Sequence, residues 1–150
     1  MKIILFQPDI PQNTGNIVRT CSVTRSSLSL VRPLGFSVSS RHLKRAGLDY
    51  WNEVEIEYID NLEEQLLKET KPFYFFSSKV KTPYTEISFN KDAILIFGSE
   101  TLGLPDVFFE KWPEKFFTIP MATDARCLNL SNSVSIVLFE GLRQQQFAFT

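Results

Sequence analysis

The sequence predicts one α/β domain with a mainly parallel sheet that carries helices on both faces. Short apolar runs typical of strands alternate along the chain with segments of helical spacing. Several runs are continuously apolar, as in parallel strands buried on both sides. The 150 residues are 43% hydrophobic and 22% charged, which is enough for a core without disulfides, and 14 Phe predict an aromatic-rich core. Without a repeat or linker, we expect residues 1–150 to form a single domain.

The N-terminal segment predicts a strand followed by a helix. Residues 2–6 contain the apolar run Ile-Ile-Leu-Phe and indicate a buried strand, which Pro8 and Pro11 end. The cap-type residues 13–16 follow, and we expect them to precede the helix. The apolar face of that helix has helical spacing and consists of Ile17, Val18 and Cys21.

The next elements alternate in the same way. Residues 28–31 predict a second strand, and residues 39–46 a short basic helix that Gly47 stops. Residues 54–59 alternate apolar and acidic side chains, as in a half-exposed strand. Asp60, followed by Glu63, is a candidate N-cap for a helix that runs to about residue 69.

The second half begins with an aromatic strand at residues 73–76. Residues 79–92 show little pattern and are expected to form a loop, and residues 93–97 give a clear buried strand. Pro105 suits the first turn of a helix that runs to residue 112. Residues 116–119 then predict the last strand.

The last helix is capped by Ser131 or Asn132 and runs to about residue 146. It has a main apolar stripe and a second apolar face formed by Ile136 and Phe139. A helix that is apolar on two faces packs against two neighbours. One is its own sheet, and the second could be another subunit. The stripe consists of Val134, Val137, Leu138 and Leu142.

Charge is unevenly distributed along the chain. The formal net charge of −1 combines +6 over residues 1–48, −7 over residues 49–70 and balanced charges over residues 71–150. The basic N-terminal third could form a face that binds phosphates. The other interpretation, charges scattered over a folded surface, stays open on this pattern alone.

Composition argues against several classes of protein. One His and two Cys do not suffice for a multi-His metal site, a four-thiolate zinc site or a disulfide scaffold, so we expect no metal. Without a Gly-x-Ser-x-Gly elbow, and with His42 in a basic stretch, a Ser-His-Asp hydrolase is not expected. Apolar runs shorter than the roughly 18 residues of a membrane span, and a short N-terminal one, predict a cytoplasmic protein without a membrane partner.

Three loops follow predicted strands and are rich in Gly, Asn and Ser: residues 13–19, 98–105 and 119–133. In parallel sheets, ligands bind where loops leave the carboxyl ends of the strands. Each loop by itself is also explained as a turn with a helix cap. The spacing of Gly98 and Gly103 fits neither a P-loop nor a dinucleotide fingerprint.

Together, these loops resemble those of the SPOUT superfamily of RNA methyltransferases, and more narrowly the small tRNA 2′-O-methyltransferases of the TrmL (YibK) type. The likeness extends from residue 3 to about residue 146, without an extra RNA-binding domain. The segments that carry it are residues 11–19, 45–50, 97–105 and 129–134.

The resemblance implies a fold, a partner and a reaction. The fold is the α/β knot, in which the C-terminal segment threads a loop to form a trefoil knot, and the partner is a second copy in a homodimer with active sites near the interface. The implied cofactor is S-adenosyl-L-methionine. The implied product is a 2′-O-methyl ribose at the wobble nucleotide, position 34, cytidine or modified uridine, of leucine tRNAs. Alternatives are a ribosomal RNA 2′-O-methyltransferase and a non-catalytic RNA-binding protein of the same fold.

The resemblance also assigns site residues. Its catalytic candidates are Arg19, Glu100 and Asn129. Because a guanidinium stays protonated, Arg19 suits holding a phosphate or ribose, or stabilising a developing alkoxide, better than acting as a base. Tail contacts beyond about residue 146 are not assumed. The cofactor-binding candidates are Phe76, Gly98, Gly103, Ile119, Met121, Cys127, Leu128 and Ser131, with Cys127 standing where related enzymes often have Ser. The basic residues of the N-terminal third give the candidates for tRNA phosphate contacts, which are Arg19, Arg25, Arg41, Lys44 and Arg45.

Overall fold

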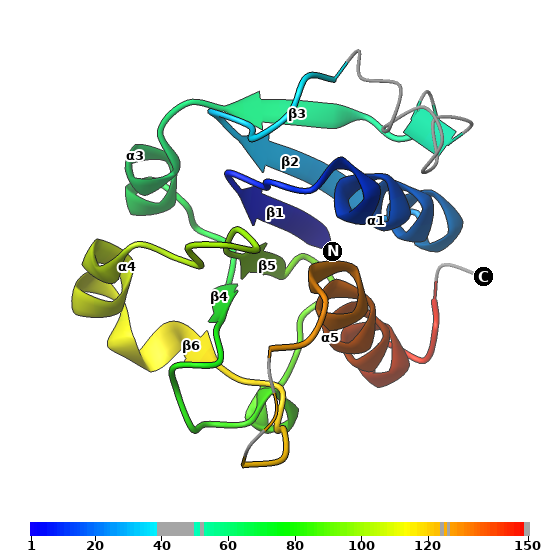
Figure 1. Ribbon diagram of the computed structural model, residues 1–150. Helices are drawn as coiled ribbons and strands as arrows, with labels where there is room; N and C mark the ends of the chain where they lie inside the picture. The colour runs from blue at the N-terminus through cyan, green and yellow to red at the C-terminus, as the bar shows by residue number, and fades with distance from the viewer. Residues whose placement is uncertain (39–49, 52, 124, 126, 149–150) are drawn as a thin grey trace.

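A computed structural model describes residues 1–38, 50–51, 53–123, 125 and 127–148 (Figure 1). Its centre is a six-stranded sheet in the order β3-β2-β1-β5-β4-β6, and every adjacent pair is parallel. The predicted parallel sheet is therefore confirmed. The strands are β1 (Lys2–Phe6), β2 (Ser27–Val31), β3 (Ile56–Ile59), β4 (Phe73–Phe76), β5 (Ile94–Phe97) and β6 (Phe116–Phe117).

Helices cover both faces of the sheet, as expected. Figure 1 shows α1 (Pro11–Thr24) and α5 (Leu130–Gln144) on one side, and α3 (Leu62–Leu67) and α4 (Asp106–Lys111) on the other. Two buried clusters correspond to the two faces. The cluster under α1 and α5 includes the predicted apolar faces of both helices: Ile17, Val18, Cys21, Val134, Val137, Leu138 and Leu142.

The other face has the aromatic core that the Phe content predicts. Phe75 is fully buried and stacks on Phe108, Trp112 and Phe116, with ring centroids 5.4, 5.9 and 4.6 Å away. These rings join β4, α4 and β6, so the short edge strand β6 is held by stacking as well as by its hydrogen bonds.

The start of α1 differs from the prediction. Residues 13–16 lie inside the helix, which begins at Pro11 with Ile10 as its N-cap residue. Pro11 suits this position because the first N–H groups of a helix have no intrahelical partner and proline has no N–H to leave unpaired. The side chains of Asn13 and Thr14 are buried rather than exposed at a helix end.

Two further N-caps shift by one to three residues. Asn61, not Asp60, caps α3, because its side-chain oxygen accepts a hydrogen bond from the backbone N–H of Glu64. Asn129 caps α5 in place of Ser131 or Asn132, since its Oδ1 accepts from the backbone N–H of both residues. Asn and Ser are equally good caps, so residue type alone did not discriminate between them.

Other boundaries move slightly. Residues 79–92 contain a short 3₁₀ turn, Tyr84–Glu86, and a second 3₁₀ turn, Pro113–Lys115, precedes β6. Pro105 is the N-cap residue of α4 rather than a member of its first turn. The last strand stops at Phe117 instead of residue 119. The basic helix predicted at residues 39–46 lies outside the described residues.

The second apolar face of α5 remains exposed in the isolated chain. Ile136 is 37% exposed and Phe139 is 44% exposed. Val23 of the neighbouring helix α1 is 56% exposed. Across the described ranges, no helix is both long and apolar enough to cross a membrane.

We expect Phe75→Ala to lower the free energy of unfolding by about 3–5 kcal/mol, because it removes a fully buried ring from a stacked cluster. Urea denaturation followed by circular dichroism measures the change. Leu67→Ala is the control, because Leu67 is 65% exposed and its truncation should cost less than about 0.5 kcal/mol. Equal effects of the two substitutions would contradict this account of the core.

Candidate active site

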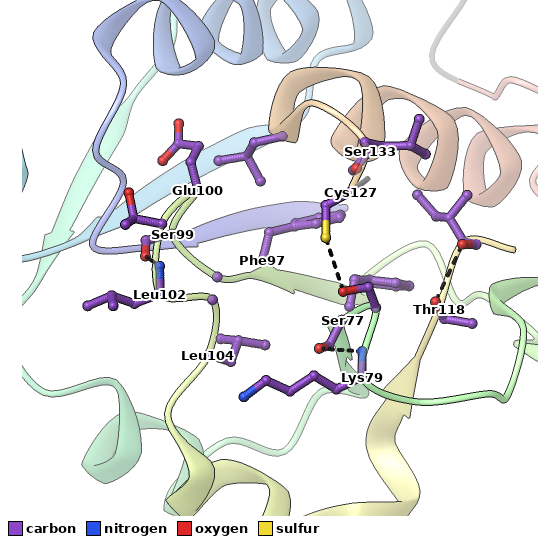
Figure 2. Close-up of a pocket in the computed structure, with 18 of the residues that line it drawn as sticks. Ser77, Lys79, Phe97, Ser99, Glu100, Leu102, Leu104, Thr118, Cys127 and Ser133 are labelled. Carbon is purple, nitrogen blue, oxygen red and sulfur yellow. Dashed lines mark hydrogen bonds between the residues drawn. The ribbon is translucent and has the colours of Figure 1, made fainter. Parts of the chain in front are cut away.

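A cavity of about 290 Å³ opens at the carboxyl edge of the sheet (Figure 2). The ends of β4 and β5, the loop after β5 and the segment between β6 and α5 form its walls. The structure brings seven of the eight predicted cofactor-binding residues together around it. They are Phe76, Gly98, Gly103, Ile119, Met121, Cys127 and Leu128.

The loop after β5 is a tight hairpin fixed by two glycines. Ser99 and Gly103 exchange backbone hydrogen bonds of 3.2 and 3.0 Å, and the Ser99 hydroxyl accepts from the backbone N–H of Leu102 at 3.1 Å. Gly103 has a φ of +71°, which side chains rarely adopt. A Cβ on Gly98 would lie 2.3 Å from the carbonyl carbon of Gly103, so only glycine lets the hairpin close on itself.

This hairpin places Glu100 at the cavity, where both of its carboxylate oxygens accept hydrogen bonds. Oε2 accepts from the backbone N–H of Asp9 at 2.8 Å, and Oε1 accepts from the Asn13 side-chain amide at 2.9 Å. The Asp9 carboxylate in turn accepts from the backbone N–H of Thr101 at 3.3 Å. The loops after β1 and β5 are thus joined at the site.

Asn129 adjoins the cavity between two lining residues, Leu128 and Leu130. Its Nδ2 donates to Asn13 Oδ1 at 2.8 Å. Its Oδ1 accepts from the backbone N–H of Ser131 at 2.9 Å and from the Ser131 hydroxyl at 2.6 Å. Ser131, predicted to bind cofactor, is buried outside the cavity lining and holds Asn129 in place.

The remaining catalytic candidate, Arg19, lies away from this cavity. It is exposed on α1, and its guanidinium lies 5.0 Å from the centre of the Tyr50 ring. Arg25 is also exposed, one residue beyond the end of α1. Arg41, Lys44 and Arg45 lie outside the described residues.

The two cysteines differ sharply in environment. Cys127 is exposed at the cavity, and its Sγ lies 3.3 Å from the Ser78 hydroxyl; a dashed line from the Cys127 sulfur marks this contact in Figure 2. Cys21 is on the buried face of α1, and burial raises the pKa of its thiol to about 12. Cys21 is therefore a small core residue, as its place on the apolar helix face predicted.

Asn13 was not predicted as a site residue, although it lies in residues 11–19, one of the segments that carry the family resemblance. A buried amide on an otherwise apolar helix face was the available signal, but we interpreted it as a cap. The residues after β4, such as Ser78 and Lys79, also line the cavity without having been predicted. Within the residues that the structure describes, no group of three or more His, Cys, Asp and Glu side chains could hold a metal ion.

Comparison with known proteins gives consistent matches over the chain. The profile of the SpoU rRNA Methylase family matches residues 1–139. A Listeria monocytogenes relative is 48% identical over 97% of this chain and 88% of its own length. A Yersinia pestis relative named tRNA (cytidine(34)-2′-O)-methyltransferase is 41% identical over 96% of this chain and 93% of its own.

Solved structures show the same architecture. One, described as giving structural insights into the 2-OH methylation of C/U34 on tRNA, has a TM-score of 0.89 at 37% identity and covers 97% of this chain and 95% of its own. AviRb from Streptomyces viridochromogenes, a SpoU methyltransferase solved in complex with AdoMet, has a TM-score of 0.82 at 19% identity. It covers 97% of this chain and 58% of its own. At that identity AviRb bears on the fold alone.

We expect Gly98→Ala to destabilise the protein toward the upper end of about 1–3 kcal/mol, because the new Cβ meets backbone atoms that cannot rotate away. Gly103→Ala is the matched control. It adds a methyl group where no atom lies within 4 Å, so only its positive φ costs about 1–2 kcal/mol. Thermal unfolding of both variants compares them, and a Gly98→Ala melting temperature equal to that of the wild type would refute the close approach.

Proposed function

Because the chain belongs to the SpoU rRNA methylase family and is a methyltransferase, we propose that it methylates the ribose 2′-hydroxyl of the tRNA wobble nucleotide, position 34. The names of close relatives support this target. We further propose S-adenosyl-L-methionine as the methyl donor, and cytidine or modified uridine of leucine tRNAs as the acceptor. We also propose that the reaction takes place in the cytoplasm, in keeping with a tRNA substrate.

The lining of the cavity suits this cofactor. The cavity volume of about 290 Å³ lies just below the roughly 300–1,000 Å³ of small-molecule pockets. Phe97, Ile119 and Leu128 offer apolar walls for an adenine ring, and the backbone of Gly98 is part of the cavity lining. The match to a methylase family over residues 1–139 supports the choice of a methyl donor.

When bound, S-adenosyl-L-methionine supplies a methyl group on a sulfonium, ready for transfer to a hydroxyl in line with it. The protein's task is then mainly to position the ribose. We propose that Asn129 and Glu100 set this geometry, since their polar groups are fixed beside the cavity by hydrogen bonds. Arg19 would hold the ribose or its phosphate, because it remains protonated.

We propose that the protein acts as a homodimer through the exposed apolar face of α5. Ile136 and Phe139 present apolar area that the isolated chain leaves in water. Arg19 lies on α1, the helix beside α5 on the same face of the sheet, so a dimer through this face brings Arg19 toward the interface. Arg25, Arg41, Lys44 and Arg45 would add phosphate contacts to the tRNA.

The path of the C-terminal segment supports the proposed trefoil knot. Thr118 donates its backbone N–H to Thr82 and accepts from Tyr84, both at 2.8 Å, within the loop that follows β4. The chain then returns past the ends of β4 and β5 along the cavity and enters α5. We propose that this return passes through the loop.

We expect the purified protein to transfer labelled methyl groups from S-adenosyl-L-methionine to total tRNA, with the label mapped to the ribose of position 34 in leucine tRNAs. Asn129→Ala and Arg19→Ala should each lower kcat by about 100-fold, because positioning is lost. Asn132→Ala is the matched control: Asn132 is exposed in the first turn of α5, and activity should stay within about twofold.

Three outcomes separate the alternatives. Label found only in ribosomal RNA favours the rRNA enzyme. Retention of RNA without any cofactor-dependent transfer favours the non-catalytic protein. Full activity of both Ala variants refutes the catalytic assignment while leaving the reaction itself intact.

We expect the wild type to sediment at twice the mass of the 17.3 kDa chain, and Ile136→Asp/Phe139→Asp to sediment as a monomer, because charges would be buried in the interface. Leu67→Asp is the control, since Leu67 is 65% exposed on the opposite face of the sheet. Analytical ultracentrifugation measures the mass. A monomeric wild type, or a dimer of the double variant, would refute this interface.

A further inference from the structure

We propose that Asn13 is a positioning residue for methyl transfer: its side-chain amide fixes the orientation of Asn129 and of the Glu100 carboxylate together. The inference rests on the proposed function, because it assigns Asn13 a task in that reaction. Asn13 comes from α1, Glu100 from the hairpin after β5 and Asn129 from the N-terminus of α5. One amide therefore joins residues 87 and 116 positions away in the sequence.

The hydrogen bonds allow one arrangement of these amides. The backbone N–H of Ser131 can only donate, so the Asn129 atom facing it is the oxygen, and the Asn129 amide nitrogen faces Asn13. The Asn13 atom that receives this bond is its oxygen. Its nitrogen therefore faces Glu100, whose ionised carboxylate can only accept. Both ends of the chain of bonds require the same orientation.

Asn13 is suited to this task because it is rigid and shielded. Asn13 is 5% exposed, so water does not compete for the hydrogen bonds of its side-chain amide. It also lies within the first turn of α1 and not in a loop. The N-cap bonds of Asn129 use its oxygen, and Asn13 holds the opposite end of the same amide. Loss of Asn13 therefore frees the Asn129 amide nitrogen while the α5 cap remains.

Asn13 affects the reaction through the positions of Glu100 and Asn129 beside the cavity. Glu100 lines the cavity, and Asn129 lies between two residues that do. A misplacement of about 1 Å in a positioning group can lower a rate about 100-fold. Asn13 itself does not line the cavity, so it would act through its two partners and not by touching the cofactor.

A swap of hydrogen-bond polarity tests the proposal. Asn13→Asp places a carboxylate against that of Glu100, so like charges meet and a donor is lost. In Asn13→Asp/Glu100→Gln, the introduced glutamine can donate from its amide nitrogen to the introduced carboxylate, while the glutamine oxygen still accepts from the backbone N–H of Asp9. The introduced carboxylate also still accepts from the amide nitrogen of Asn129. The double variant thus keeps every bond of the network with one polarity reversed.

The first readout is kinetic. We expect Asn13→Ala and Asn13→Asp to lower kcat for tRNA methylation about 100-fold, with the dissociation constant of S-adenosyl-L-methionine within about threefold. The double variant should recover at least about tenfold over Asn13→Asp. Asn16→Asp, the same change at an exposed position three residues along α1, is the control and should keep full activity. A kcat of Asn13→Ala within about twofold of the wild type would overturn the proposal.

The second readout does not depend on activity. Nuclear magnetic resonance of ¹⁵N-labelled protein reports the side-chain amide of Asn129, assigned with Asn129→Asp. Its signals should move in Asn13→Ala and Asn13→Asp and return in the double variant, and unchanged signals in the single variants would overturn the proposal. If the Asn129 amide signals respond to the substitutions as described but the wild-type protein methylates no tRNA, the proposed function is refuted instead. The two failures are therefore distinguishable.

Discussion

The parallel pairing of β1 with β5 at the centre of the sheet is the constraint on which the site depends. Its register sets Leu5 opposite Phe97, so the segments that follow β1 and β5 leave the sheet side by side at the same edge. Asp9 and Glu100, 91 residues apart, then come within hydrogen-bond distance. An antiparallel pair would send the two loops to opposite edges and leave no shared site. The hydrogen bonds that Glu100 accepts from Asp9 and Asn13 are consequences of this one pairing.

Much of the fold follows from local pattern, and the error at the start of α1 has a tertiary cause. Continuous apolar runs identified β1, β4 and β5, because a strand buried on both faces has no polar side, and alternation of apolar and acidic residues identified β3. The start of α1 was wrong because Asn13 and Thr14 are residue types that favour caps, whereas tertiary contacts bury them inside the helix. Apolar periodicity also identified the two faces of α5, of which Ile136 and Phe139 stay exposed in the single chain.

The site was predictable where the chemistry resides in loop motifs. Gly98, Ile119 and Cys127 were predicted to lie together, and they line one cavity. Asn13 and Ser131 could not be placed in the same way, since their roles depend on partners that only the folded chain brings near. Arg19 is the opposite case: it matches a motif but lies on α1 against Tyr50, away from the cavity of its own chain.

The two cysteines differ in exposure, so a thiol reagent can label one of them selectively. The thiolate is the form of cysteine that attacks thiol reagents, and Cys21, buried and with its pKa raised to about 12, supplies almost none at neutral pH. Cys127 is exposed at the cavity mouth beside Ser78. A maleimide fluorophore would therefore label a single position without any engineered substitution. A change in its fluorescence emission would report the binding of a ligand in the cavity. Cys127, which stands where related enzymes often have Ser, would thus serve as a labelling site for binding measurements.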